Sequence, residues 1–336
     1  MTGLATTDGA PLRAALAAEL AGLSERSLAA RVERLSAVYR SGEVPTAPVL
    51  DAPMAAAAYA AYRMPATYGA VVAALRAARA ALPSFAPTTV LDVGAGTGAA
   101  SWAVTDVHAP EHLVLLEQSP EAVRLGRALA RHSGAPALRS ADWRVARLSG
   151  AAPLPAADLV VAAYLLGELA EPLQAALVAS AAASAAVVAL VEPGTPAGSA
   201  RIVRARDQLL ALGLRIAAPC PHDGTCPLAT GRDWCHFAAR VPRSGLHRRL
   251  KDGRLAHEDE QLSYVVASRP EPTARPAARV LRHPQQRKGL VTLELCAGPD
   301  RAELARIGRR HGPLHRAARD TDWGDPWPPG AVEAPD

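Results

Sequence analysis

The stretch Thr88-Thr-Val-Leu-Asp-Val-Gly-Ala-Gly-Thr-Gly98 decides the fold. Its apolar, β-branched first half predicts a strand, and its second half is a turn that contains Gly94, Gly96 and Gly98, followed by small residues that are compatible with a helix. Glycine permits positive φ angles and lets a ligand approach the backbone closely, while the N-terminus of the following helix offers free N–H groups. The stretch therefore predicts a site for a nucleotide-like cofactor.

A second feature supports this prediction. Val114-Leu-Leu-Glu117 has the pattern of the next strand and ends in a carboxylate about 20 residues after the glycines, the spacing of the ribose-binding acid in nucleotide-binding folds. A lone glycine turn is weak evidence, because such turns also occur in purely structural loops. With Asp92 before it, however, Asp-Val-Gly-Ala-Gly-Thr-Gly resembles motif I of S-adenosylmethionine-dependent methyltransferases and departs from the Gly-x-Gly-x-x-Gly spacing of dinucleotide dehydrogenases.

The rest of the chain alternates between strand-like and helix-like segments, which predicts an α/β fold with a parallel, doubly wound sheet. We expect a seven-stranded class I methyltransferase (Rossmann-like) sheet within residues 86–270, preceded by a helical module over residues 1–85 and followed by a small β tail over 271–336. A Cys-rich, metal-binding insertion is expected at 219–260, because the interval before the last strand is too long for an ordinary connection. The expected strands are 88–93, 112–117, 137–140, 158–164, 186–191, 213–218 and 262–268.

In such a sheet the ligand lies beyond the carboxyl ends of the strands. Asp142 and Trp143 are expected there to cap and stack an adenine, although a surface aspartate and a core tryptophan fit the sequence equally well. Tyr164 or Glu168 is a candidate base or positioning residue, against the alternative of a core tyrosine and a glutamate at a helix start. The predicted cofactor-binding residues are Asp92, Gly94, Ala95, Gly96, Gly98, Glu117, Gln118, Asp142 and Trp143.

Three of the four cysteines lie within 16 residues, as Cys220, Cys226 and Cys235, and the fourth is Cys296. The spacing C-x5-C-x8-C is not that of scattered core residues, and the chain carries no export signal that would favour disulfides. Thiolates of this kind suit an iron–sulfur cluster or zinc, and the spacing alone does not choose between them. His222 and His236 are rival ligands to Cys296.

Most of the positive charge comes from arginine, because Lys251 and Lys288 are the only lysines in a chain of net charge +5. A dense basic run follows the cysteines, and a second basic group lies in the predicted tail; such runs are usually solvated faces, but beside a metal site they also form phosphate-binding patches. The candidate RNA-binding residues are Arg240, Arg243, Arg248, Arg249, Lys251, Arg287 and Lys288. Residues 1–40 lack the apolar core of a secretory signal. We expect a cytoplasmic protein that does not span a membrane and is a monomer.

Several further motifs resemble the methyltransferase-like family of the mitochondrial small-ribosomal-subunit protein 22, including its bacterial members. The resemblance spans about residues 55–328 and does not cover residues 1–50. It is carried by Tyr62-Arg-Met-Pro65, the Asp92–Gly98 loop, Tyr164-Leu-Leu-Gly-Glu-Leu169, Glu192-Pro-Gly-Thr-Pro-Ala-Gly198, Cys220-Pro-His-Asp-Gly, Cys226-Pro, Trp234-Cys-His-Phe237, Pro242-Arg-Ser, Glu258-Asp-Glu, Arg287-Lys-Gly289, Leu293-Glu-Leu-Cys296 and Trp323-Gly-Asp.

The resemblance implies a role with the small ribosomal subunit, in assembly or translation, through contact with rRNA. It also implies an S-adenosylmethionine pocket and a 4Fe–4S cluster on Cys220, Cys226, Cys235 and Cys296. The leading hypothesis is an S-adenosylmethionine-dependent methyltransferase-like protein that methylates the rRNA of this subunit or matures the subunit. Two other functions are kept beside it: a non-catalytic RNA-binding assembly factor that retains the cofactor pocket as structure, and a small-molecule methyltransferase with a structural zinc.

Overall fold

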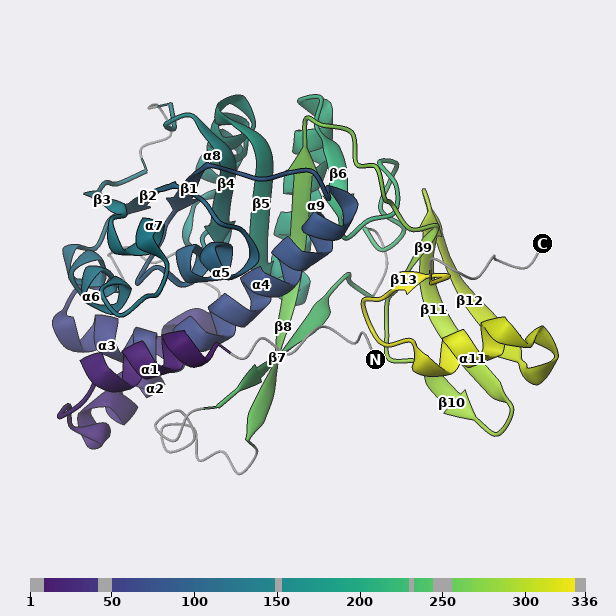
Figure 1. Cartoon of the computed structure of the whole chain (residues 1–336), viewed down its shortest axis with the longest axis horizontal. Helices are drawn as coiled ribbons and strands as arrows, with labels where there is room; N and C mark the ends of the chain where they lie inside the picture. Colours follow the sequence, from purple (N-terminus) through teal and green to yellow (C-terminus); the bar gives the residue numbers. More distant parts are fainter. Residues whose placement is uncertain (1–8, 42–49, 149–152, 230–232, 244–255, 330–336) are drawn as a thin grey trace.

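The computed structural model describes residues 9–41, 50–148, 153–229, 233–243 and 256–329. Its main feature is an eight-stranded sheet in the order β3-β2-β1-β4-β5-β8-β6, with β7 paired to β8 (Figure 1). Strands β1 to β5 pair in parallel, and β8 runs antiparallel to both β5 and β6. A parallel sheet that starts from a central first strand and carries one antiparallel strand between its last two members is the class I methyltransferase fold. The strands are Thr89–Val93 (β1), His112–Glu117 (β2), Asp142–Val145 (β3), Ala157–Ala163 (β4), Ala185–Pro193 (β5), Arg215–Ala218 (β6), Phe237–Pro242 (β7) and His257–Ser268 (β8).

The sheet is buried on both faces, as the nearly continuous apolar strands require. Alternate residues of each strand belong to two separate cores: Val90 and Val161 pack with one group of helices, whereas Leu91 and Val160 pack with the other. This is the period-2 alternation of a strand. The helices of the first group are Ala10–Glu19 (α1), Glu25–Ser41 (α2), Pro53–Tyr62 (α3), Met64–Ala81 (α4), Ala99–Val107 (α5), Pro120–Ala130 (α6) and Pro136–Arg139 (α7); those of the second are Glu171–Ser184 (α8) and Pro196–Ala211 (α9).

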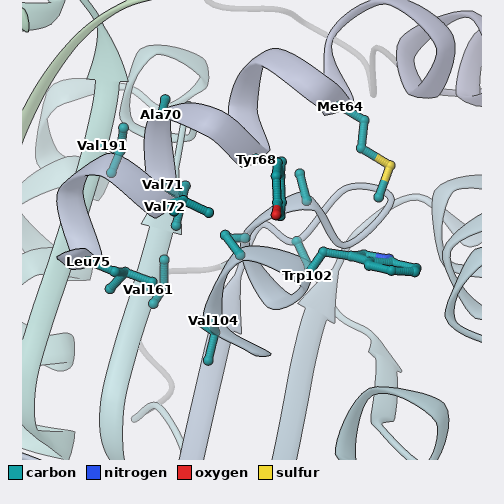
Figure 2. Close-up of a cluster of buried hydrophobic side chains, with 14 of the residues drawn as sticks. Met64, Tyr68, Ala70, Val71, Val72, Leu75, Trp102, Val104, Val161 and Val191 are labelled. Atoms are coloured by element: carbon teal, nitrogen blue, oxygen red, sulfur yellow. The ribbon is translucent and has the colours of Figure 1, made fainter. Parts of the chain in front are cut away.

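Helix α4 joins the N-terminal helices to the sheet. It crosses one face of the sheet (Figure 1), and its apolar side chains, among them Val71, Val72 and Leu75, meet Val161 and Val191 of the strands (Figure 2). Met64 and Tyr68, nearer the start of the helix, lie beside Trp102 of α5 in the same view. Because α4 starts beside the glycine loop, the N-terminal helices border the predicted cofactor crevice.

The C-terminal segment forms a second, smaller sheet that stands beside the β6 edge of the main sheet (Figure 1). The helix α11 (Pro313–Asp320) covers one of its faces with Leu314 and Ala318, against Val291, Leu293 and Leu295. Its strands are Ala278–Val280 (β9), Gln285–Arg287 (β10), Leu290–Gly298 (β11), Arg301–Gly308 (β12) and Pro326–Trp327 (β13).

The structure departs from the sequence-based expectation in the third strand, in the last strand, and in an eighth strand, β7, that was not expected. Residues 137–140, expected to be the third strand, lie mostly in the short helix α7, and the strand starts only at Asp142. The last strand is antiparallel and begins at His257, five residues earlier than expected, because its first half pairs with β7. In the described part of the chain, no helix combines the length and apolarity needed to cross a bilayer.

Candidate functional site: a glycine-loop crevice and a four-cysteine pocket

The glycine loop has the backbone conformation that its sequence predicts. Gly94, Gly96 and Gly98 have φ angles of 69°, 55° and 90°, in the left-handed region that favours glycine. The amides of Gly94 and Ala95 donate to the carbonyl of Leu116 at 2.8 and 3.0 Å, which fixes the loop against the end of β2. The loop therefore sits at the carboxyl ends of β1 and β2.

Glu117 is placed at this same edge as the last residue of β2. Its carboxylate is buried and accepts hydrogen bonds from the amides of Gly96 at 2.8 Å and Ser119 at 2.7 Å. Burial raises its pKa despite these donors. The Gln118 amide is a third backbone donor to this carboxylate. Because a carboxylate has about four acceptor sites, Glu117 retains capacity for about one ribose hydroxyl. Gln118, the next residue, is exposed.

Asp92 lies behind the loop, and one of its carboxylate oxygens is held by Ser101. The same oxygen accepts from the amide and the hydroxyl of Ser101 in α5, at 3.0 and 2.7 Å, and the side chain is 2% exposed. Burial raises its pKa to about 7, and the hydrogen bonds from Ser101 only partly offset the loss of solvent. Asp92 thus braces the loop against α5.

Asp142 and Trp143 do not lie where the sequence placed them. Because β3 begins at Asp142, the register pairs Asp142 with Val114 and brings Val145 level with Glu117. Asp142 is therefore near the amino end of the strand, about 10 Å along it from the crevice. It is exposed and pairs with Arg144 at 2.7 Å. A Cβ placed on Gly98 or Gly126 would come within 2.9 or 2.2 Å of the Trp143 ring, so this ring fills the core between them.

Tyr164 is the centre of a polar cluster at the end of β4. Its φ angle of 58° is rare for a non-glycine residue. Its hydroxyl lies 2.8 Å from Glu260 Oε1, which also accepts from Arg63 Nη2 at 2.9 Å, and the Arg63 guanidinium stands 5.2 Å from the centre of the tyrosine ring. Burial and the nearby Glu260 raise the pKa of Tyr164 well above its ordinary value.

The hydrogen bond from Tyr164 to Glu260 argues against Tyr164 as the predicted base. A tyrosine whose hydroxyl donates to a carboxylate and resists ionisation is a hydrogen-bond donor rather than a proton acceptor. Glu168, the other candidate, is half-buried in a short 3₁₀ turn, Leu166–Glu168. Sequence reasoning overlooked Arg63 and Glu260 as site residues, although both lie in quoted motifs. The sequence carried no signal for this contact, because it arises from the antiparallel pairing of β8, which extends its first half past the carboxyl end of β5.

The space around the glycine loop is partly occupied by the protein itself. A Cβ placed on Gly94 would lie 2.7 Å from Leu165, and one on Gly96 would lie 3.5 Å from the ring of Tyr59. Glu117 and Gly96 suit the ribose of S-adenosylmethionine, whereas Leu165 packs beside Gly94. The residues that would hold the cofactor are therefore better placed for its ribose than for its methionine.

All four cysteines line a single pocket of about 330 Å³, a volume that includes its open mouth. Cys220 and Cys226 come from the loop after β6, Cys235 precedes β7, and Cys296 lies on β11 of the C-terminal sheet. All four thiols are free. Burial, and after it the neighbouring cysteines, raise the pKa of Cys296 to about 12 and that of Cys235 well above its usual range.

Two buried arginines hold the walls of this pocket. Arg279 of β9 donates to the carbonyls of Pro219 at 2.9 Å and Gly324 at 3.0 Å. Arg206 of α9 donates to the carbonyls of His222 and Gly224, and to Asp207 at 2.8 Å. Sequence reasoning missed both, because isolated arginines in a helix and a strand carry no local signal.

The two histidines differ in their access to the pocket. His222 Nε2 lies 3.5 Å from the Cys296 sulfur. His236 is stacked on Trp234 with ring centres 5.1 Å apart and meets Trp323 edge-on, while its Nδ1 lies 3.0 Å from the Trp234 carbonyl. Only His222 is therefore placed as a rival ligand.

The four cysteine sulfurs around one pocket are a donor set that suits either a 4Fe–4S cluster or a zinc ion. Zinc would draw four sulfurs to roughly 3.8 Å of each other, given a zinc–sulfur bond of about 2.3 Å, whereas each thiolate of a 4Fe–4S cluster binds a different iron. Within the described ranges, no three Cys, His, Asp or Glu side chains form a metal-binding group.

A protein-family model matches most of the chain. The model described as mitochondrial small ribosomal subunit Rsm22 matches residues 53–328. The chain belongs to the Rsm22 family. The match includes the glycine loop, the Arg63–Glu260–Tyr164 cluster and all four cysteines.

Two curated relatives of this Rsm22-family chain carry informative names. The ribosome assembly protein METTL17, mitochondrial, from Homo sapiens is 29% identical over 286 residues, which cover 80% of this chain and 61% of the relative. The Rsm22-cox11 tandem protein 2, mitochondrial, from Schizosaccharomyces pombe is 28% identical over 187 residues, which cover 42% of this chain and 24% of that protein. The chain thus spans about three fifths of the human relative. Both names contradict the cytoplasmic location predicted from the sequence, and that prediction is wrong.

Among solved structures, the magnesium protoporphyrin IX methyltransferase of Synechocystis is similar at 15% identity and a TM-score of 0.40, over 61% of this chain and 83% of that one. The assignment of the Rsm22-family chain to the class I methyltransferase fold depends on the strand order and direction described above.

The candidate RNA-binding residues are placed unequally. Arg240 is exposed and pairs with Asp259 at 2.8 and 3.0 Å, and the half-buried Arg243 pairs with Glu258 at 2.9 Å. These partners offset their charge locally. Arg287 and Lys288 are exposed at the turn between β10 and β11. Arg248, Arg249 and Lys251 lie outside the described residues.

The Asp92 carboxyl gives a test of the loop's electrostatics. Its folded pKa of about 7 exceeds its ordinary 3.8, so the folded state binds more protons across this interval and loses stability as pH rises through it. We expect the free energy of unfolding of Asp92→Asn to fall less steeply between pH 4 and 7 than that of the native chain, by at most about 1.4 kcal/mol per pH unit. Urea unfolding at several pH values measures both slopes. Parallel slopes would show that Asp92 is ionised in the folded protein.

Proposed function

We propose that this chain is an S-adenosylmethionine-dependent, methyltransferase-like protein that acts on the small ribosomal subunit, through rRNA methylation, subunit assembly or both, and that carries a 4Fe–4S cluster. Two features together support this proposal most. The sheet has a methyltransferase strand order with a ribose-side acid, Glu117, and a four-cysteine pocket lies at the same side of the sheet, where the parallel strands end. The ribosomal role rests on the Rsm22 family and on the human relative, which is named a ribosome assembly protein.

The residues have separate tasks in this proposal. Bound S-adenosylmethionine would supply the methyl group for transfer. Glu117 would accept a hydrogen bond from a ribose hydroxyl, and Gly96 and Gly98 keep the backbone close enough for contact with the cofactor. Tyr164 would orient a substrate or close the crevice through the hydrogen bond from its hydroxyl to Glu260. Cys220, Cys226, Cys235 and Cys296 would hold the cluster, and the exposed Arg287 and Lys288 would contact rRNA phosphates.

Two observations favour the second candidate function, a non-catalytic assembly factor. Leu165 occupies the space beside Gly94, and the Tyr164 hydroxyl is already committed to Glu260. A crevice of this kind would keep the methyltransferase fold as a scaffold for RNA contacts. Binding of the cofactor would require movement of Leu165, whereas the assembly role would not.

The experiment that decides between them uses immature small subunits from cells that lack the protein. Purified, cluster-loaded protein is added with methyl-labelled S-adenosylmethionine, and subunit binding and transferred label are read in one sample. We expect binding together with label in the rRNA. The Glu117→Ala variant should bind the cofactor at least tenfold more weakly, because it loses a charged hydrogen bond of about 1.5–3 kcal/mol.

Glu121→Ala is the matched control, because Glu121 is also acidic and close in sequence but lies on helix α6 and pairs with Arg124. It should leave both readouts unchanged. Tight binding with no label would favour the assembly factor. Absence of both binding and label, in protein that contains its cluster, would reject the ribosomal role.

A further inference from the structure

Arg206 is an unusual residue for a helix on the outer layer of the fold. Its side chain is only 3% exposed, although it carries a permanent charge. It reaches from α9 into the loop after β6, where it donates to the carbonyls of His222, at 3.3 Å, and Gly224. The Arg206 guanidinium, which comes from helix α9, therefore holds the loop between Cys220 and Cys226.

One donor of this guanidinium is left over. Arg206 Nε is buried and has no hydrogen-bond partner among the described residues. Its one carboxylate partner, Asp207, is 60% exposed, so solvent screens that ion pair. Burial of a charge without full compensation is costly, and native structures rarely leave a buried donor unmatched. A buried anion beside the guanidinium would account for the arrangement.

Cys220 is the group that supplies such an anion. It lies within hydrogen-bonding reach of the Arg206 guanidinium; burial works against the arginine's charge, but Cys220 and then Asp207 raise its pKa above the ordinary value. A cysteine that ligates a metal is a thiolate. A loaded pocket would therefore place a buried anion beside Arg206, in addition to the largely exposed Asp207.

The net charge of the cluster and its thiolates determines how Arg206 would affect the reduction potential. A 4Fe–4S core of charge 2+ with four thiolates carries a net charge of −2, and addition of one electron makes it −3. The potential of such a cluster depends on the net charge around it and on hydrogen bonds to its sulfurs. A buried cation that donates to one thiolate stabilises the more negative, reduced form.

We propose that Arg206 is the residue that compensates the thiolate charge of Cys220 and raises the reduction potential of the cluster. This inference rests on the proposed presence of the cluster. It separates Arg206 from Arg279, whose Nε and Nη1 both donate to backbone carbonyls and which acts as a clamp between the loop and the C-terminal sheet.

The test compares Arg206→Gln and Arg206→Lys with a control, Arg204→Gln. Arg204 lies on the same helix, but its side chain is 51% exposed and pairs with Glu171 on the surface. Each full-length protein is purified anaerobically, its iron and sulfide are measured, and its cluster is titrated with a mediated reductant while the paramagnetic reduced state is followed by electron paramagnetic resonance.

We expect Arg206→Gln to lower the equilibrium constant for one-electron reduction at least tenfold, which is a fall of 59 mV or more in the midpoint potential. Arg206→Lys should restore most of it, because it keeps the charge. The control should match the native chain. An unchanged potential in Arg206→Gln would overturn the proposal.

Loss of iron in both Arg206 variants, with thermal unfolding unchanged, would also overturn it, since Arg206 would then be a mechanical anchor of the loop. Failure of the proposed cluster itself gives a different result. In that case the native chain would contain no iron, or Cys226→Ser would contain as much as the native chain.

Discussion

Replacement of Cys296 by serine is expected to reduce the iron and sulfide content of the anaerobically purified protein to less than a tenth of the native value. Cys296 is the only cysteine that the C-terminal sheet contributes to the pocket. In the proposed site each of the four irons is held by one thiolate, and a serine hydroxyl is a poor substitute for the soft sulfur ligand. Iron and sulfide analysis together with the visible absorption spectrum measure the effect.

His222→Ala is the control for this variant, because His222 Nε2 lies 3.5 Å from the same sulfur and is the alternative ligand. It should retain the cluster. Full iron in Cys296→Ser, together with loss of iron in His222→Ala, would assign the fourth position to the histidine. Stoichiometric zinc in a stable native protein would instead reject the cluster.

The apo form of Cys296→Ser should keep the C-terminal sheet docked. Arg279 donates to the carbonyl of Pro219, and Trp323 Nε1 donates to the carbonyl of His236 at 3.1 Å. Neither contact involves the cysteines. Limited proteolysis at the connection between the two sheets should then be no faster in the variant than in native protein from which the metal has been removed.

The second large effect is expected at Arg63. Replacement of Arg63 by methionine should lower the free energy of unfolding by about 3 kcal/mol, because removal of one member of a buried ion pair leaves the other charge without compensation. The side chains of Arg63 and Glu260 are 20% and 13% exposed, so solvent screens this pair only weakly. The variant also loses the cation–π contact with Tyr164. Urea unfolding at pH 7 gives the difference.

Arg76→Met provides the comparison, since Arg76 is 40% exposed and stands 3.9 Å from its partner, Asp106. It should cost less than about 1 kcal/mol. The double variant Arg63→Met with Glu260→Gln should recover part of the stability lost in the single variant, because the stranded charge is removed. Equal losses for Arg63→Met and Arg76→Met would show that the cluster around Tyr164 contributes no more than a surface pair.

The local sequence determined much of this protein. The apolar run that ends at Val93 favours a strand, and the three glycines after it favour a left-handed turn. Glu117 follows at the end of the next strand. Spacing also indicated that the cysteines belong together, because three of them lie within a short segment. These features depend on neighbours in the chain, which the sequence states directly.

Tertiary structure alone decided the rest. The start of β3 is fixed by its register with β2, so Asp142 moved away from the crevice and Trp143 into the core between Gly98 and Gly126. The antiparallel pairing of β8 brought Glu260 to Tyr164 and Arg63 from positions about 100 and 200 residues apart. Arg206 acquired its place beside Cys220 only when α9 packed under the cysteine loop. Contacts of this range have no periodicity or spacing in the sequence, because the packing of whole elements determines them.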